Sequence, residues 1–284
     1  MSDDQTDQGP DSPFASIDEA VAAIRRGELV IVVDDEDREN EGDLIMAAQH
    51  ATPERIAFMV NHTSGVICTA ITGERADALE LPLMVTDNTD AMRTAFTVTV
   101  DRRHGTTTGI SAADRALTIQ TLADPSAVPG DLNRPGHIFP LRARPGGVLK
   151  RAGHTEAAVD LAAMAGLEPS GVLCEIVKPD GSMSRLPDLV EFAAEHDLLL
   201  ISIAEMIRYR RRTEKLVTRV AEATIPTKVG DFQAVVYESE LDGEQHVAFV
   251  RGNPQHSDNV LVRVHSECLT GDIFGSLRCD CGPQ

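Results

Sequence analysis

The chain is organised around residues 29–43, LVIVVDDEDRENEGD, where an apolar run passes directly into seven carboxylates and one arginine. Residues 29–33 are apolar, mostly β-branched and bounded by charge, which predicts a buried strand. The carboxylates then follow the carboxyl end of a strand, where α/β proteins usually bind their ligands. Like charges on one loop repel each other, and a divalent cation offsets that repulsion because hard oxygen ligands suit Mg2+ and Mn2+. We interpret residues 34–43 as a metal-binding loop.

The commonplace alternative is a solvated or disordered acidic run, which composition alone favours. Two features argue against it. The run lies between the predicted strand and a second apolar segment, residues 44–48, and it contains Arg38, whose guanidinium suits bidentate recognition of carboxylate or phosphate. A calcium loop of the EF-hand type fits poorly, because the preceding segment is strand-like and Asn40 stands where such a loop needs glycine.

Composition excludes several classes of protein. The 284 residues carry a formal net charge of −19, which argues against sequence-independent binding of nucleic acid or of an anionic membrane. No apolar run has the length of a membrane span, and no signal peptide is evident. Five cysteines, an odd number, favour free thiols or metal ligands over a disulfide framework. We expect a cytoplasmic enzyme.

Hydrophobic patterning divides the chain into three parts. Residues 1–15 predict a disordered acidic tail. Residues 16–212 alternate helical and strand patterns without a repeat period, which predicts an α/β or α+β domain with a layered mixed sheet flanked by helices. Residues 213–284 predict a truncated β-rich module, with the alternation of antiparallel strands at 217–220, 232–237 and 247–250.

Local signals place the elements of the first domain. Ser16 and Glu19 form a capping box at the start of a helix. Residues 130–140 are rich in proline and glycine and predict a loop that holds His137. The other predicted elements are helices at 53–60, 111–123 (with Ala113, Leu117 and Leu122 inward), 188–196 and up to 212, a loop followed by a helix over 151–167, and strands at 65–70, 95–100, 171–177 and 198–203.

A second group of candidate ligands is found at residues 151–156, RAGHTE. His154 can ligate a metal through a neutral imidazole nitrogen, and Arg151 can hold a phosphate. Thr155, with the start of a helix behind it, can donate to an anion, and Gly153 permits close approach of a ligand. The alternative is that His154 is simply the first residue of a helix.

Two further side chains are candidates for acid–base chemistry. Flanking proline and glycine pin the direction of His137, although a lone histidine in a loop is more often structural or exposed. Glu175 interrupts an apolar strand, and a carboxylate is rarely buried without a partner. A semi-buried glutamate suits a general acid or base.

Three cysteines gather near the C-terminal end of the sequence. Cys268, Cys279 and Cys281 fit three zinc ligands with a fourth position open for water. Cys68 and Cys174 lie inside apolar strands, which indicates core thiols.

Four stretches together resemble 3,4-dihydroxy-2-butanone 4-phosphate synthase of riboflavin biosynthesis: residues 34–43, 108–116, 135–141 and 151–156. The resemblance covers residues 16–212. It implies conversion of ribulose 5-phosphate to formate and 3,4-dihydroxy-2-butanone 4-phosphate, with Mg2+ or Mn2+ and no organic cofactor, in a homodimer with sites at the subunit interface. It further implies that Glu39 and His154 bind the metal and that His137 and Glu175 are essential. The sugar phosphate would contact Arg38, Glu39, Asp43, Arg151, Ala152, Gly153, His154, Thr155 and Glu175.

The part from Val217 resembles the beginning of GTP cyclohydrolase II, a pairing found in bifunctional riboflavin enzymes. The family's catalytic aspartate and arginine have no counterpart up to residue 284, so we expect no cyclohydrolase activity and a poorly packed second module. GTP ring opening by that module and a non-catalytic metal- or phosphate-binding subunit are the rival hypotheses. The resemblance implies zinc at the three clustered cysteines and GTP contacts from Arg263, Val264, His265, Ser266, Glu267 and Gln284.

Overall fold

The computed structural model describes residues 12–256 and 259–281. The chain divides into two compact units, Met1–Leu216 and Val217–Gln284. Most of the predicted acidic tail, and Gln284, lie outside the described residues. No helix in the described ranges is long and apolar enough to cross a membrane.

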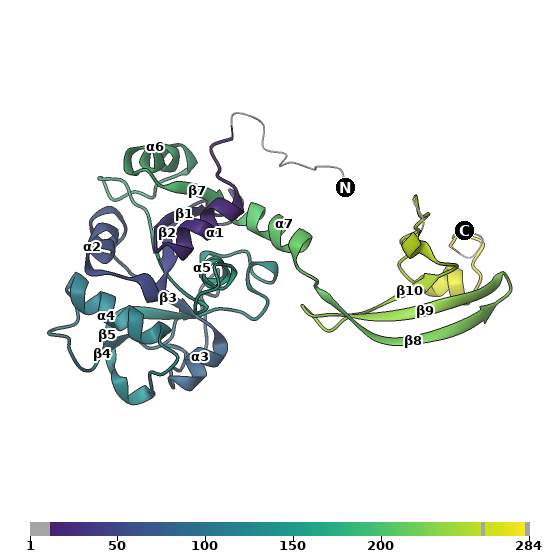
Figure 1. Cartoon of the computed structure of the whole chain (residues 1–284), viewed down its shortest axis with the longest axis horizontal. Helices are drawn as coiled ribbons and strands as arrows, with labels where there is room; N and C mark the ends of the chain where they lie inside the picture. The colour runs from purple at the N-terminus through teal and green to yellow at the C-terminus, as the bar shows by residue number, and fades with distance from the viewer. Residues whose placement is uncertain (1–11, 257–258, 282–284) are drawn as a thin grey trace. The chain divides into compact units, whose positions relative to one another are not determined.

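The first unit is built on one mixed sheet of seven strands, in the order β4-β5-β3-β6-β2-β1-β7. Helices flank this sheet, which confirms the predicted layered mixed architecture (Figure 1). The strands are β1 Val30–Val33, β2 Gly42–Ala47, β3 Cys68–Ile71, β4 Val100–Arg102, β5 Leu132–Arg142, β6 Ser170–Glu175 and β7 Leu199–Ser202. The helices are α1 Ile17–Arg25, α2 Pro53–His62, α3 Gly73–Ala78, α4 Ala112–Ala123, α5 His154–Met164, α6 Leu186–His196 and α7 Ile203–Thr213.

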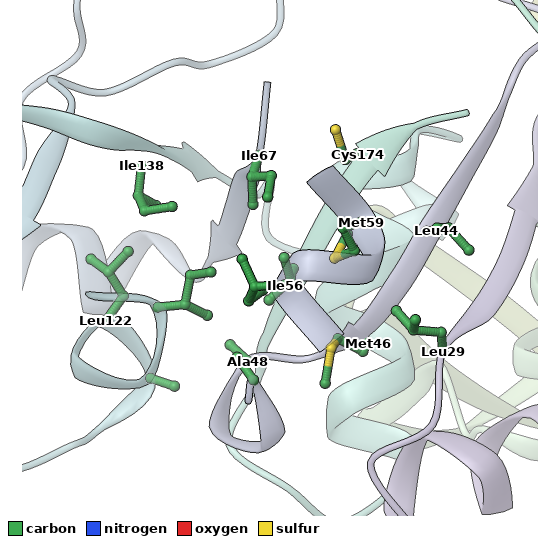
Figure 2. Packing of buried hydrophobic residues seen from close by; sticks show 14 of the residues in the cluster. Leu29, Leu44, Met46, Ala48, Ile56, Met59, Ile67, Leu122, Ile138 and Cys174 are labelled. Carbon is green, nitrogen blue, oxygen red and sulfur yellow. The ribbon is translucent and has the colours of Figure 1, made fainter. Parts of the chain in front are cut away.

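The central strands contribute to two hydrophobic layers, because neighbouring side chains of a strand point to opposite faces of the sheet. Val32 of β1 belongs to the layer that includes α1, α5 and α7, whereas Ile31 belongs to the layer that includes α2, α4 and α6. Figure 2 shows the second layer, with Met46 of β2 beside Ile56 and Met59 of α2. Burial on both faces makes the centre of the sheet a rigid platform for the loops at its edge.

The first two helices begin at the signals that the sequence predicts. The Ser16 hydroxyl accepts the N–H of Glu19, and the Glu19 carboxylate accepts the N–H of Ser16, which completes the capping box of α1. The Thr52 hydroxyl accepts the N–H of Arg55 at the start of α2, with Pro53 in the first turn.

The prediction of a loop at residues 130–140 is wrong, because β5 spans Leu132–Arg142. Gly136 explains why proline and glycine do not exclude a strand here. A Cβ at this position would lie 2.0 Å from the carbonyl carbon of Val100 on β4, so only glycine lets the two strands approach. The register between β4 and β5 also shifts at Val100 and Asp101, as at a bulge.

Two smaller predictions also fail. Residues 95–100 are not a regular strand, because only isolated bridges at Phe96 and Thr97 precede β4. In α4, Ala113 is exposed and Leu117 is half-buried, while Leu122 is buried as predicted. The buried side of that helix includes Ala116, Ile119, Leu122 and Ala123.

The second unit contains a three-stranded antiparallel sheet in the order β10-β9-β8, as the alternation predicts. Its strands are β8 Val217–Thr227, β9 Gly230–Ser239 and β10 Gln245–Val250. Large apolar side chains remain exposed in this unit, among them Phe249 at 59% and Leu277 at 102%.

Candidate active site

The acidic loop, residues 34–41, joins the antiparallel strands β1 and β2 and is folded around Asp34. The Asp34 side chain is fully buried and accepts the backbone N–H groups of Glu39 (3.1 Å) and Glu41 (2.9 Å). The guanidinium of Arg38 donates to Asp34 (2.7 Å) and to Glu39 (2.6 Å). The loop is therefore a built structure and not a solvated acidic run.

His154, the first residue of α5, faces this loop from the interior and is only 5% exposed. Its Nε2 lies 3.1 Å from the carbonyl oxygen of Val32 and can only donate there. Its Nδ1 lies 3.6 Å from a carboxylate oxygen of Glu39 and 3.8 Å from one of Asp43. The backbone thus orients the ring so that Nδ1 faces the carboxylates, as in metal sites where the second nitrogen is held by a carbonyl.

The pKa values of Asp43, Glu39 and His154 in this cluster are shifted strongly from their ordinary values. Burial raises the pKa of Asp43 to about 7. Burial acts in the same direction on Glu39, but contact with His154 and the charge of Arg38 outweigh it and hold the pKa at about 2. Burial opposes protonation of His154, but the carboxylates of Asp43 and Glu39 outweigh it and raise the pKa to about 9. The cluster favours a cation among its oxygens.

The donor set also fits a divalent cation. Ligand atoms of Asp34, Glu39 and His154 all lie within 4.8 Å of one another. Oδ1 of Asp43, on β2 beside them, is buried and has no hydrogen-bond partner among the described residues. Carboxylate oxygens with one imidazole nitrogen suit Mg2+ or Mn2+. Asp34 was not predicted as a candidate ligand, although its place directly after the strand is a usable signal.

A pair of guanidinium groups meets over Gly153, next to this cluster. A Cβ on Gly153 would lie 2.3 Å from Nη1 of Arg151 and 3.1 Å from Nη2 of Arg38. Arg151 is held by Glu156 at 2.7 Å and by Thr94 at 3.2 Å. Two cations at the N-terminus of an eleven-residue helix form an environment for a phosphate group. Ala152 is exposed at this edge and Thr155 is buried in the first turn of α5.

Glu175, at the end of β6, is the direct cross-strand partner of Asp43 on β2. It is half-buried, and the Ser64 hydroxyl donates to its Oε2 at 2.8 Å. The same hydroxyl lies 3.3 Å from Sγ of Cys174. Ser64 holds the candidate acid–base carboxylate in place, and no local sequence signal predicts this contact.

His137, on β5, stands apart from the other candidates. It is exposed, and it pairs with Asp101, which the sequence analysis did not single out. If the β3–β5 and β3–β6 registers are extended by two residues, His137, Glu175 and Asp43 lie on one line that crosses the strands of the sheet. Strands β3 and β6 lie between β5, which carries His137, and β2, which carries Asp43. Three strand spacings amount to roughly 14 Å between the backbones of His137 and Asp43.

The second unit brings its three clustered cysteines together as predicted. Sγ of Cys279 lies 3.6 Å from that of Cys268 and 2.8 Å from that of Cys281. Hydrogen bonds from Thr270 and from the N–H of Gly271 lower the pKa of Cys268 to about 7, which favours the thiolate that metals require. Of the predicted GTP contacts, residues 263–267 are exposed and Gln284 lies outside the described residues.

Comparison with known proteins identifies the family. The family model of 3,4-dihydroxy-2-butanone 4-phosphate synthase matches residues 18–209. The chain belongs to this family. The family model of GTP cyclohydrolase II matches residues 218–284, so part of a second domain follows the synthase domain.

Two curated relatives are riboflavin biosynthesis proteins that match nearly the whole of this chain. The bifunctional riboflavin biosynthesis protein RIBA 1 of Arabidopsis thaliana is 61% identical over 97% of this chain and 51% of its own length. The riboflavin biosynthesis protein RibBA of Nocardia farcinica is 63% identical over 95% of this chain and 66% of its own length. The chain thus spans about half to two thirds of these relatives.

Solved synthase structures share the fold. RibBX of A. baumannii, a two-domain synthase, matches with a TM-score of 0.80 and 46% identity over 95% of this chain and 79% of its own. A synthase solved in complex with two magnesium ions matches with a TM-score of 0.69 and 48% identity over 70% of this chain and 98% of its own. The seven-stranded unit is therefore the synthase fold.

Proposed function

We propose that this synthase-family chain converts ribulose 5-phosphate to 3,4-dihydroxy-2-butanone 4-phosphate and formate in riboflavin biosynthesis. The observation that carries the proposal is the adjacency of a carboxylate–imidazole cluster, centred on Glu39 and His154, to the guanidinium pair over Gly153. The first suits a divalent metal and the second suits a phosphate. A sugar phosphate that reacts at a divalent metal requires a metal-binding group and a phosphate-binding group side by side.

Glu39 and His154 would hold Mg2+ or Mn2+, with Asp43 close by to receive a hydroxyl of the sugar or a metal-bound water. A bound divalent ion would stabilise negative charge on adjacent oxygens of the substrate. The magnesium-bound relative supports the choice of metal. Arg38 and Arg151 would fix the phosphate group and so orient the carbon chain toward the carboxylates.

The reaction must enolise a ketose, eliminate water, migrate a carbon and expel C4 as formate. Each of these stages moves protons at carbon or oxygen, which requires positioned acid–base groups. Glu175 lies directly opposite Asp43 on the neighbouring strand and supplies a carboxylate from outside the acidic loop. His137 offers its second ring nitrogen, Nε2, for the same task, because Nδ1 faces Asp101.

We further propose a homodimer in which His137 of one subunit completes the site of the other. The separation of His137 from Asp43 along the sheet supports this arrangement. The apolar side chains next to His137 also favour a covered surface: Val66 is 43% exposed and Ile110 is 52% exposed. A second copy of the chain is the occupant that would bring a histidine to the metal cluster.

The test is formate release from ribulose 5-phosphate, with and without Mg2+, by wild type and by Glu39→Ala. Metal-dependent formate that disappears in the variant is the expected result. A folded, Mg2+-loaded wild type that binds the sugar phosphate and releases no formate would favour the rival hypothesis of a non-catalytic binding subunit.

The thiol cluster supports a second, separate proposal, that Cys268, Cys279 and Cys281 bind zinc. Three thiols within contact distance, one of them with a pKa near 7, suit Zn2+. Zinc content of the purified chain, measured before and after Cys279→Ser, tests this. GTP ring opening would require formate release from GTP in addition.

A further inference from the structure

Arg185, directly before α6, reaches across to the backbone of the acidic loop. Its Nη1 donates to the carbonyl oxygen of Glu39 at 2.9 Å and to that of Asn40. The same nitrogen lies 3.9 Å from a carboxylate oxygen of Glu41. A guanidinium from a distant part of the sequence is therefore hydrogen-bonded to the backbone of Glu39, whose carboxylate faces His154.

The acidic loop needs such an external restraint. It carries six carboxylates between residues 34 and 41, which repel one another. A cavity of about 200 Å3 lies against the loop, lined in part by Asp35, Glu36, Asn40 and Glu41. Packed side chains do not fill the space beside Asn40 and Glu41, so the internal contacts of Asp34 and Arg38 are not backed there by packing.

Helix α6, which begins directly after Arg185, packs tightly against the sheet. A Cβ on Gly42, where β2 begins, would lie 2.4 Å from the side chain of Leu189, so α6 packs tightly against the strand that follows the loop. The backbone N–H of Arg185 donates to Asp188 at 2.9 Å, which ties the residue to the first turn of α6. The guanidinium thus extends from a fixed helix end to a loop with free space behind it.

We propose that Arg185 is a positioning residue for metal binding, which holds the backbone of residues 39–40 so that the Glu39 carboxylate stays within reach of His154. The inference rests on the proposed metal site. Arginine suits this task because its guanidinium donates several hydrogen bonds in a fixed plane, whereas a lysine supplies charge without that geometry.

The chain offers a matched control in Lys178. This residue belongs to the same segment before α6 and pairs at 3.6 Å with Asp188, the carboxylate that also accepts the backbone N–H of Arg185, so its removal tests the loss of charge and of this ion pair without touching the acidic loop. Lys178→Met removes one positive charge from the neighbourhood, as Arg185→Met does. Any difference between the two variants then reports the contact with residues 39–40 and not the bulk charge.

The experiment measures Mn2+ binding to the metal-free full chain by electron paramagnetic resonance, and hydrogen exchange of the amides of residues 34–43. Arg185→Met removes both hydrogen bonds to the loop and is expected to weaken Mn2+ binding by at least about tenfold to a hundredfold, the effect of one charge-assisted hydrogen bond, and to speed exchange at Glu39 and Glu41. Arg185→Lys should fall between this variant and wild type. Lys178→Met should resemble wild type in both measurements.

Equal Mn2+ affinity and equal exchange in Arg185→Met and wild type overturn the inference, and so do equal losses in Arg185→Met and Lys178→Met. A wild type that binds Mn2+ but releases no formate refutes the proposed function and leaves this inference intact. If the wild type binds no Mn2+, the inference about metal binding fails with the metal site.

Discussion

The carboxylate of Asp101 contacts both the backbone and the ring of His137. Oδ1 of Asp101 accepts the backbone N–H of His137 at 2.9 Å, and Oδ2 lies 2.7 Å from ring Nδ1. A carboxylate only accepts, so Nδ1 carries a proton, and in the neutral imidazole Nε2 is then the acceptor. Gly109 closes the arrangement, because a Cβ there would lie 2.1 Å from the Asp101 carboxylate and 2.7 Å from Nδ1 of His137.

The first prediction concerns this pair. Asp101→Asn keeps the shape but can turn an amide N–H toward Nδ1, which moves the ring proton to Nε2 and removes the acceptor. We expect kcat for formate release to fall by about 10²-fold or more, the usual contribution of a general acid or base, with little change in KM. The thermal midpoint should stay close to that of wild type.

Asp77→Asn is the control for this change. Asp77 pairs with Arg142, the last residue of β5. Its kcat should equal that of wild type. A kcat for Asp101→Asn within threefold of wild type would show that the tautomer of His137 is irrelevant to the reaction.

The second prediction uses Gly153. Gly153→Ala places a methyl group where the guanidinium groups of Arg151 and Arg38 converge. Both are flexible at that end, so the fold should tolerate the change while the phosphate contacts are displaced. We expect KM for ribulose 5-phosphate to rise about tenfold to a hundredfold, the loss of one charged hydrogen bond, with a smaller change in kcat.

Gly130→Ala serves as the matched control, because nothing lies within 4 Å of a Cβ at that position. Its KM and thermal midpoint should match those of wild type. An unchanged KM in folded Gly153→Ala would place the phosphate group elsewhere.

Sequence patterns found the parts of the site that are local in the chain. The strand before the acidic loop and the helix start at His154 are local signals, so the acidic loop and His154 could be predicted as candidate metal-binding elements, although Asp34 itself was not singled out. The contacts of Asp101 with His137 and of Ser64 with Glu175 join residues 36 and 111 positions apart, and no local pattern encodes them. These pairs required the tertiary structure.

The fold, like the site, was predicted where local sequence patterns determine the structure and missed where long-range contacts do. The alternating apolar runs predicted the layered mixed sheet because hydrophobic burial determines both. β5 was missed because proline and glycine disfavour a strand locally. Its pairing with β3 and β4, and the close approach at Gly136, override that preference. Tertiary contact decided the structure of this segment against its composition.

The third prediction concerns pH and the ring cluster between α2 and α6. His62 lies against Phe58, Phe192 and His196, with ring centroids 4.5, 5.8 and 4.8 Å away. Burial lowers the pKa of His62, and the charge of His196 lowers it further, while Glu195 partly offsets both. The unfolded chain therefore binds this proton more tightly than the folded chain, and stability is lost as pH falls below the unfolded pKa of about 6.5.

His62→Phe removes that proton site and retains the ring contacts. We expect the thermal midpoint of the variant minus that of wild type to increase as the pH is lowered from 7 to 5. His104→Gln, in an exposed loop, should keep a constant difference from wild type over the same range. A constant difference for His62→Phe as well would contradict the prediction.

The fourth prediction tests the shared site of the proposed homodimer. His137→Ala and Glu39→Ala are each expected to be inactive, because one lacks the histidine and the other a metal ligand. If each site takes His137 from one subunit and Glu39 from the other, a mixed dimer of the two variants contains one intact site and one doubly defective site. Subunit exchange should then restore formate release, to about a quarter of the wild-type rate per chain for an equal mixture with random pairing.

The control is a mixture of Glu39→Ala with His154→Ala. These two residues lie 3.6 Å apart in one chain, so every site in that mixed dimer lacks a metal ligand and no activity should return. Restoration in the first mixture and not in the second is the expected result. If the first mixture also stays inactive after exchange has been verified by mass spectrometry of differently tagged subunits, each site is confined to one chain. His137 would then have to act across roughly two strand widths from Glu175 within its own sheet.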